Sequence, residues 1–244
     1  MISIHASAVC RVRDGYTGRP LGGSVLLCTL DGVAFRPVAK PGGYLVLVNL
    51  APGSHRLSLR SRGYQEEWVE FQADGGTREL DITMKPGEGY PFRYAVARLL
   101  LTTLAGDRAA VDRRLWLAVP GRFECKLAQT KAEAGDQEVR LYCRGQEAVP
   151  GIYLISDDAD SEIVNLRAVE GERGVLAVPL CRDHSRGRRF LPAQGYHTGG
   201  DGRLTAVYRE PCTVEVFAEE GGLLAGIPLA VGDNEYTIRL EEGE

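Results

Sequence analysis

The sequence predicts an all-β fold, in which one β-sandwich is followed by a second β-rich domain that is expected to be a sandwich as well. Val, Leu and Thr gather in short runs typical of strands. The 30 glycines and 12 prolines punctuate these runs, and no long helical period replaces them. A chain of 244 residues exceeds the usual size of one small domain, so two domains are expected.

The first domain consists of predicted strands separated by tight turns. Residues Ile4 to Arg13 nearly alternate in hydropathy and stop at Asp14-Gly15, where the chain turns. Further strands are predicted at Val25 to Leu30, Tyr44 to Leu50, His55 to Ser61, Glu67 to Gln72 and Arg78 to Met84. This pattern is typical of a small antiparallel sandwich whose two sheets bury their inward residues against each other.

A short segment rich in proline and glycine marks the domain boundary. Residues 85–91 read KPGEGYP, and two prolines with two glycines cannot extend a ladder of strands. We therefore expect one domain at residues 1–85, a linker at 86–91 and a second domain at 92–244.

The second domain also reads mainly as strands. Residues 106–114 are compatible with a helical turn, and 128–136 have a helix-forming composition, but both are short. Strands are predicted at 94–104, 114–119, 138–143, 151–155, 162–169, 175–180, 203–208, 213–218 and 235–240. One stretch also echoes the first domain: GDGRLTAVY at 200–208 precedes Glu210-Pro211, as GGYLVLVNL at 42–50 precedes Ala51-Pro52. This echo favours a second sandwich.

The turn residues of the first domain occur in a specific order. Asp14 precedes Thr17-Gly18-Arg19-Pro20, and Gly43-Tyr44-Leu45, Asn49-Leu50-Ala51-Pro52-Gly53 and Gly63-Tyr64 follow. This order resembles the carboxypeptidase regulatory-like, or transthyretin-like, family. Glycine permits positive φ and proline holds φ near about −65°, so these residues suit chain reversals. The residues expected to shape turns are Asp14, Thr17, Gly18, Pro20, Gly43, Tyr44, Asn49, Pro52, Gly53, Gly63 and Tyr64.

The resemblance covers about a third of the chain and implies an Ig-like sandwich for residues 1–85. It implies a role only loosely, because such modules occur in peptidases, receptors, adhesins and secreted assemblies. The zinc site of a carboxypeptidase is not expected, since none of the four histidines is followed by glutamate three residues later.

Composition narrows the classes of partner. The formal net charge of −4 lacks the basic excess of nucleic-acid binders, so no nucleic-acid partner is expected. No run approaches the roughly 20 apolar residues of a membrane span, and the N-terminus lacks the pattern of an export signal. We therefore expect the protein to be synthesised in the cytoplasm without export. It could still be part of a particle that is released from the cell.

The six cysteines allow two interpretations. An even number could form three disulfides, but they are thinly spread and no zinc-finger spacing occurs. Reduced cysteines in the core are the favoured interpretation. They are Cys10, Cys28, Cys125, Cys143, Cys181 and Cys212.

No sequence motif predicts catalysis, a cofactor or a metal site. The chain contains no G-x-S-x-G elbow, P-loop or dinucleotide fingerprint. The segment Cys181-Arg182-Asp183-His184 offers three donor types but too few spaced ligands. Residues 157–162 offer carboxylates but lack the glycine and terminal glutamate of an EF-hand, so a solvated turn is favoured.

Two groups of residues remain candidates for partner contact. Arg182, Arg186, Arg188 and Arg189 form the densest basic group, and guanidinium groups suit carboxylate or phosphate partners. Trp68, Trp116, Tyr16, Tyr44 and Tyr64 would suit a carbohydrate platform, although Tyr44 and Trp68 are expected in the core.

The expected function is therefore not enzymatic. The leading hypothesis is a structural or adaptor protein acting through protein contacts, as a subunit of an assembly such as a phage-tail-like or contractile injection particle. The alternative is a glycan- or peptide-binding sandwich that uses its loops. A third hypothesis is an enzyme with a site near Cys181, His184 and His197.

Overall fold

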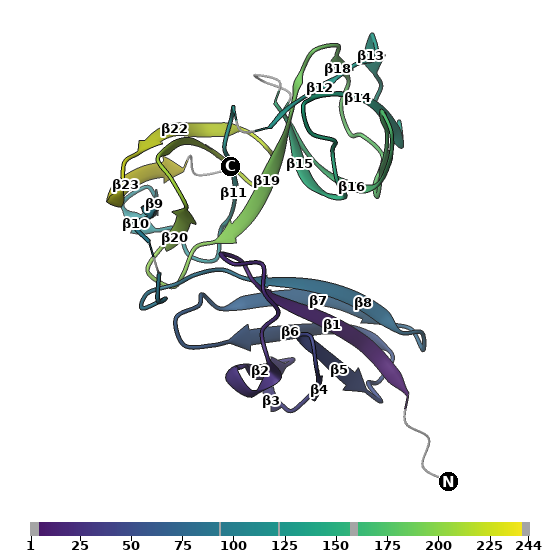
Figure 1. Cartoon of the computed structure of the whole chain (residues 1–244), viewed down its shortest axis with the longest axis vertical. Helices are drawn as coiled ribbons and strands as arrows, with labels where there is room; N and C mark the ends of the chain where they lie inside the picture. The colour runs from purple at the N-terminus through teal and green to yellow at the C-terminus, as the bar shows by residue number, and fades with distance from the viewer. Residues whose placement is uncertain (1–4, 93, 122, 157–160, 241–244) are drawn as a thin grey trace. The chain divides into compact units, whose positions relative to one another are not determined.

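The computed structural model describes residues 5–92, 94–121, 123–156 and 161–240. Within these ranges the secondary structure is almost entirely β, with a single 3-10 turn, η1, at Gly23–Val25, so the all-β prediction is confirmed. The chain divides into two compact units, Met1–Tyr94 and Ala95–Glu244 (Figure 1). No helix in the described ranges has the length and apolar character to cross a membrane.

The first unit is a sandwich of two sheets. Its strands are β1 (Ala6–Asp14), β2 (Leu27–Leu30), β3 (Val33–Phe35), β4 (Val38–Lys40), β5 (Tyr44–Val48), β6 (Gly53–Arg60), β7 (Glu67–Ala73) and β8 (Arg78–Met84). One sheet has the order β4-β5-β1-β8 and the other β3-β2-β6-β7. The first strand β1 pairs antiparallel with β5 and parallel with the last strand, β8.

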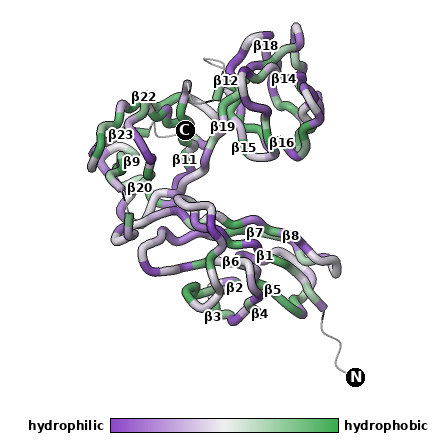
Figure 2. Tube along the Cα trace, in the orientation of Figure 1, coloured by the Kyte–Doolittle hydropathy of each residue, from purple (hydrophilic) through white to green (hydrophobic). Residues whose placement is uncertain are grey.

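Strand alternation builds the core of this sandwich. Inward positions of β1, β5 and β6 include Cys10, Leu45 and Leu57, all at most 1% exposed. Figure 2 shows the resulting mixture of hydrophobic and hydrophilic residues along the strands. The prediction that Tyr44 and Trp68 lie in the core is wrong: Tyr44 is 38% exposed beside the inward Leu45, and Trp68 is half-buried. Both residues have the strand parity that faces outward.

A buried carboxylate joins three loops at one end of the first sandwich. Asp14 ends β1 and is only 6% exposed. Its Oδ1 accepts hydrogen bonds from the backbone N–H groups of Tyr16 and Thr17, at 2.7 and 2.9 Å. Its Oδ2 accepts the hydroxyls of Tyr64 and Tyr90, at 2.7 and 2.6 Å. With two donors to each oxygen, the carboxylate is saturated and acts as a structural hub.

The hydrogen bonds at this hub determine how its groups titrate. Burial alone would raise the pKa of Asp14, but the hydrogen bonds, that from Tyr90 first, hold the pKa below its usual value. Burial and the bond to Asp14 raise the pKa of Tyr90 to about 12 and raise that of Tyr64 as well. The carboxylate therefore stays ionised and the phenols stay protonated at neutral pH.

Residues 86–91, expected to be a linker, belong instead to the first unit. Tyr90 reaches the Asp14 hub, and the backbone N–H of Gly87 donates to the carbonyl of Gly63 at 2.9 Å. The ring of Tyr90 also contacts those of Tyr16, Tyr64 and Phe92. The boundary between the units follows Tyr94.

The other predicted turn residues lie where the chain reverses. Thr17, Gly18 and Pro20 form the turn after β1, with the N–H of Gly18 donating to the carbonyl of Asp14 at 2.8 Å. Asn49 has a φ of 53°, and its side-chain oxygen accepts a hydrogen bond from the backbone N–H of His5. Gly53, which follows Pro52, opens β6, and Gly63 has a positive φ of 80° close to the backbone of Tyr90.

The second unit contains the remaining strands. They are β9 (Ala97–Ala105), β10 (Arg108–Ala109), β11 (Arg114–Ala118), β12 (Glu124–Leu127), β13 (Lys131–Ala132), β14 (Glu138–Arg144), β15 (Gly151–Ser156), β16 (Glu162–Glu170), β17 (Arg173–Leu176), β18 (His184–Ser185), β19 (Arg189–His197), β20 (Arg203–Tyr208), β21 (Cys212–Phe217), β22 (Leu223–Leu229) and β23 (Gly232–Leu240). The helical tendencies considered at 106–114 and 128–136 are not realised, because these segments hold turns and the short strands β10 and β13.

Part of the second unit repeats the topology of the first sandwich. β9 pairs antiparallel with β20 and parallel with the last strand, β23, as β1 does with β5 and β8. The facing strands β11, β21 and β22 correspond to β2, β6 and β7, and the second half of β19 takes the place of β3. Both sheets contribute to one core, which includes Leu101, Leu117, Leu204, Val216 and Ile238. The second sandwich is thus observed.

The short pattern shared by the two domains marks equivalent positions. Gly43 and Gly202 both have positive φ, and their carbonyls accept the N–H groups of Val12 and Thr103 respectively, each at 2.8 Å. A Cβ at Gly43 would lie 2.5 Å from the carbonyl oxygen of Val12, and one at Gly202 would lie 2.7 Å from that of Thr103. Glycine is required at both positions because the chain lies too close to the first strand of its sandwich for a side chain.

Between β11 and β19 the second sandwich carries an insertion. The strands β12, β14, β17, β16, β15 and β19 pair in that order, and β19 pairs back with β12, so this sheet closes on itself. We call this part the closed lobe, meaning the described residues between 124 and 191 (Figure 1). Its interior holds a second core, including Leu127, Leu141, Tyr153, Leu166 and Phe190.

The Asp14 hub generates a prediction about pH. Because the folded pKa of Asp14 is below its unfolded value of about 3.9, its carboxylate stabilises the fold above that pH, and this stabilisation is lost as pH falls through the folded pKa. Asp14→Asn should lower the free energy of unfolding by roughly 2–4 kcal/mol at neutral pH. The difference from wild type should shrink in acid. Hydrogen exchange of peptides from residues 5–92 measures both effects.

The control for this experiment is Asp81→Asn, which removes the same charge from a carboxylate that is 67% exposed and paired with Arg13. Because exposed ion pairs contribute little, this variant should change exchange only slightly. Equal effects of the two substitutions would show that Asp14 is not a hub.

The close approach at Gly202 generates a second prediction. Gly202→Ala should destabilise the second sandwich by roughly 2–4 kcal/mol, because the new methyl group meets a backbone oxygen at positive φ. Gly200→Ala, two residues away, meets no atom within 4 Å and should be nearly neutral. Thermal unfolding of the two variants distinguishes them, and similar melting temperatures would contradict the requirement for glycine.

Candidate functional site

The four predicted contact arginines differ in exposure and in the contacts that they make. Arg182 donates from its backbone N–H to Glu162 and from its guanidinium to the carbonyl of Ser161, at 3.1 and 3.3 Å. Arg186 is exposed in the turn before β19, and Arg188 is half-buried. Arg189 turns toward the second sandwich. The guanidinium groups of Arg182 and Arg189 make contacts within the fold, and partner contact by the four arginines stays a prediction.

Arg189 ties the closed lobe to the second sandwich. Its two terminal nitrogens donate to the two carboxylate oxygens of Glu215 on β21, at 3.1 and 3.2 Å, and one also reaches Ser156 at 3.0 Å. A small core lies beside this pair and includes Leu154, Leu191 and Phe217. The bidentate geometry fixes orientation as well as distance, so the lobe is joined by both polar and apolar contacts.

The segment Cys181 to His184 is organised by a buried carboxylate. Glu162, 8% exposed, accepts the backbone N–H of Cys181 at 2.7 Å, and its carboxylate also lies 3.0 Å from Nε2 of the buried His184. Within the part of the chain that the structure describes, the exposed thiol of Cys181 makes no hydrogen bond, so no activated cysteine–histidine pair forms there. The contacts of Glu162 and His184 position a loop.

The residues of the enzyme hypothesis are not brought together. His184 lies on β18 opposite Ala132, whereas His197 ends β19 opposite Arg114. β19 begins at Arg189, five residues after His184, and ends at His197; an extended strand of its nine residues spans roughly 25–30 Å. His197 instead contacts Arg114, whose Nε lies 3.3 Å from its Nε2.

The metal candidates find no support among the described residues, where no group of three or more His, Cys, Asp or Glu side chains could hold an ion. Asp183 pairs with Lys131 at 2.6 Å rather than with its neighbours in the candidate segment. Asp157, Asp158 and Asp160 of the acidic turn lie outside the described residues.

The aromatic candidates divide between structural and outward positions. Tyr16 and Tyr64 belong to the Asp14 hub. Trp68 is half-buried on the outer side of its sheet, with the Arg56 guanidinium 4.0 Å above its ring. Trp116 packs on Gly195 and donates to the carbonyl of Glu219 at 3.2 Å. Tyr16 and Tyr64 thus have structural contacts, whereas the outward Trp68 belongs to the first unit and Trp116 to the second.

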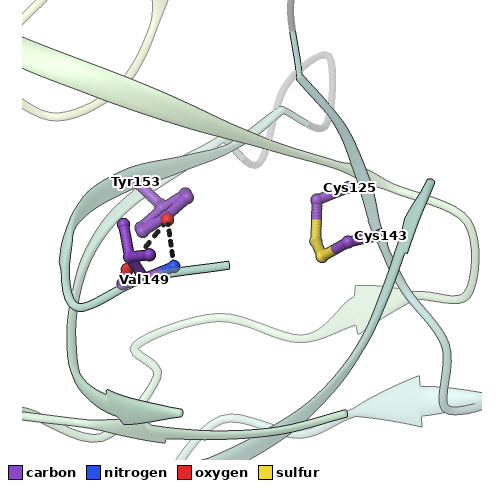
Figure 3. The surroundings of a disulfide bond; sticks show 4 residues. All are labelled: Cys125, Cys143, Val149 and Tyr153. Atoms are coloured by element: carbon purple, nitrogen blue, oxygen red, sulfur yellow. Dashed lines mark hydrogen bonds between the residues drawn. A yellow bond between two sulfur atoms is a disulfide. The ribbon is translucent and has the colours of Figure 1, made fainter. Parts of the chain in front are cut away.

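The cysteines follow the reduced-core prediction only in part. Cys10 and Cys28 are free and buried, and burial raises the pKa of the Cys10 thiol to about 12. In contrast, Cys125 and Cys143 form a disulfide between β12 and β14 (Figure 3), where the prediction is wrong. The two residues are direct partners in the register of the strands, with Cα atoms 4.0 Å apart. Cys181 is exposed rather than buried.

The disulfide lies on the inner side of β12 and β14, and the outer side of these two strands forms a solvent-exposed surface that the sequence did not predict. Strand alternation turns Cys125, Leu127 and Leu141 into the closed lobe, so their neighbours face solvent. These outward neighbours are Lys126, Arg140, Tyr142 and Arg144, which we call the basic face. They are dispersed in the sequence, and only the register of β12 on β14 places them together.

Comparisons with known proteins give no family assignment. No family model matches the chain, and no curated protein matches it. Likeness was found to crystal structures of the major pilin subunit BcpA of Bacillus cereus (8% identity, TM-score 0.28, covering 99% of this chain and 100% of that chain) and of the shaft pilin SpaA from Lactobacillus rhamnosus GG (8%, 0.28, 97% and 98%). A streptococcal ancillary pilin gives 11% identity and a TM-score of 0.24 over 95% of this chain and 61% of that one. These values are too low to transfer a role.

The cysteine arrangement generates a third prediction. The disulfide closes a loop between residues 18 positions apart, so its reduction should destabilise the closed lobe by about 3 kcal/mol. Hydrogen exchange with and without a reductant should show faster exchange in peptides from 124–191 and no change in peptides from 5–92. Unchanged protection in the closed lobe would contradict a stabilising role for the bond.

Alkylation of the native, unreduced protein provides an independent check. Cys181 should react first because its thiol is exposed, whereas burial protects Cys10 and Cys28. Cys125 and Cys143 should react only after reduction, and mass spectrometry identifies the modified residues. Alkylation of either residue before reduction would show that the bond is absent.

Proposed function

We propose that this chain is a non-catalytic structural or adaptor protein that works through protein–protein contacts, as a subunit of a larger assembly. The assembly that we propose is a phage-tail-like or contractile injection particle.

The main support for the proposal is that the buried carboxylates, which could otherwise take part in chemistry, make hydrogen bonds and ion pairs that hold the fold together. The carboxylate of Asp14 is saturated by four donors, Glu162 organises a loop together with His184, and Glu215 holds Arg189 across a junction. Groups used in this way stabilise a shape more readily than they transfer protons. Such a shape presents surfaces to neighbours.

The repeated sandwich supports the same role. Two units of one topology in a single chain provide similar exposed strand edges, since β8 pairs only with β1 and β23 only with β9 in the described ranges. A free strand edge can accept hydrogen bonds from another chain. The tandem arrangement is therefore suited to contacts with more than one neighbour.

The disulfide bears on where the protein works. Disulfides persist in oxidising compartments and are rare in the cytosol. The Cys125–Cys143 bond thus favours exposure outside the cytoplasm, as in a particle released from the cell, over a wholly cytoplasmic location.

The membership of the first unit in the carboxypeptidase regulatory-like family remains part of the proposal. Its support is the position of the motif residues: Asp14 is the hub of the loops, and Gly43 lies directly against β1 just before β5. The family is compatible with an assembly role.

A second candidate function is binding of glycan or peptide. The outward Trp68, with Arg56 above its ring, is the observation that favours it. Because that ring is already half-covered, this candidate ranks below the assembly role.

The fourth prediction concerns the native size of the protein. Tagged and expressed at low level in its own host, the chain should purify in a large particle with partners in fixed ratio, identified by mass spectrometry. An untagged strain and a tagged cytosolic protein serve as controls. Recovery of the chain alone, as a monomer, would exclude the assembly role and favour tests of glycan binding.

A further inference from the structure

The basic face is a compact group of cations around an exposed aromatic ring. Lys126 on β12 is the register partner of Tyr142 on β14, and Arg140 and Arg144 lie two positions to either side of Tyr142. Side chains at alternate positions of one strand are about 6.5–7 Å apart, and those of directly opposed residues are closer. All four residues are exposed, Tyr142 to 60%.

Two of these cations are uncompensated. Within the described ranges, Lys126 and Arg140 form no ion pair, whereas Arg173 of the closed lobe pairs with Glu138 and Glu170. Glu138, the next outward residue on β14, is held by Arg173, whose Nε lies 2.8 Å from its carboxylate. Glu124 is the register partner of Arg144, so the argument rests on Lys126, Arg140 and Tyr142.

The closed sheet dictates how a partner could bind. β14 pairs with β12 over residues 141–144 on one side and with β17 over residues 138–140 on the other, so no full-length edge of it is open to a strand. A partner must therefore bind the side chains of the outer face. Behind them, the Cys125–Cys143 bond holds the register that keeps Lys126 opposite Tyr142.

We propose that the basic face binds a carboxylate-rich segment of a partner protein. This inference rests on the proposed assembly function and identifies one of its contact surfaces. The guanidinium of Arg140 matches the geometry of a carboxylate, and tyrosine and arginine are the residues that most often anchor protein interfaces. A formal net charge of −4 repels long polyanions such as nucleic acids, which favours a protein partner with a local acidic segment.

The fifth prediction tests this face with a defined probe. The probe is a fluorescent peptide in which glutamate alternates with serine, titrated with the full chain at low salt, and the same peptide with glutamine is the neutral control. Lys126→Glu combined with Arg140→Glu should weaken binding by about tenfold or more, because two attractions become repulsions. Tyr142→Ala should weaken binding without changing its salt dependence.

A matched control reverses two charges elsewhere. Arg36→Glu with Lys40→Glu makes the same change in net charge at two exposed residues of the first unit and should leave the affinity unchanged. The milder pair Lys126→Gln and Arg140→Gln should give an intermediate loss, which keeps the test valid if the charge reversal disturbs folding. Circular dichroism verifies the fold of each variant.

Three results would overturn the inference. They are an absence of peptide binding at low salt, equal losses in the basic-face and control variants, and displacement of the peptide by heparin or oligothymidylate at lower concentrations than by unlabelled peptide. The last result would assign the face to a glycan or a nucleic acid instead.

Purification from the host separates this inference from the proposed function. If the charge-reversal variant enters the particle with all partners, the basic face is not a contact surface, but the assembly role stands. If the wild-type chain is recovered alone, the assembly role fails, and the peptide titration alone decides what the face binds.

Discussion

Both sandwiches depend on a parallel pairing between their first and last strands. β1 pairs with β8, and β9 pairs with β23, over seven and nine residue pairs respectively. Neighbouring parallel strands cannot be joined by a tight hairpin. The intervening strands therefore form the connection between the two, and β5 and β20 pair antiparallel with the other edge of the first strand. Gly43 and Gly202 directly precede β5 and β20, where the chain lies too close to the first strand for a side chain.

The second sandwich carries a large insertion at the position of a tight hairpin in the first sandwich. In the first sandwich, β2 and β3 are joined by Asp31 and Gly32, both at positive φ, as a two-residue hairpin requires. In the second, the chain leaves after Ala118 and returns at Ala193, where the two strands pair again. The entropic cost of closing a loop rises slowly with its length, and an insertion that folds on itself avoids much of that cost. The strands on either side of the insertion, β11 and β19, still pair as the two arms of a hairpin would, so the rest of the sandwich forms as in the first unit.

The fold was predictable from local chemistry, whereas the surfaces were not. Turn residues such as Asp14 and Gly53 lie where glycine, proline and capping preferences place them. Tyr44 and Trp68 were assigned to the core from their size, although the parity of Leu45 and Phe71 already indicated an outward direction. Cys125 and Cys143 could not be paired from the sequence, because only the register of β12 on β14 makes them neighbours. The basic face could not be predicted for the same reason, because its residues are dispersed in the sequence, unlike the denser run of arginines around Arg189.

Closure of the inserted sheet changes the kind of contact that each part of the chain can offer. A sandwich with open edges can extend its sheet with a strand of almost any sequence, because backbone groups supply the hydrogen bonds. The closed lobe has satisfied its strand edges internally, so any selectivity there must come from side chains. Lys126 and Arg140, which form no ion pair within the described part of the chain, lie beside the exposed Tyr142 and meet this requirement. In such an arrangement the sandwiches would supply general adhesion, and the inserted lobe would determine which partner is accepted.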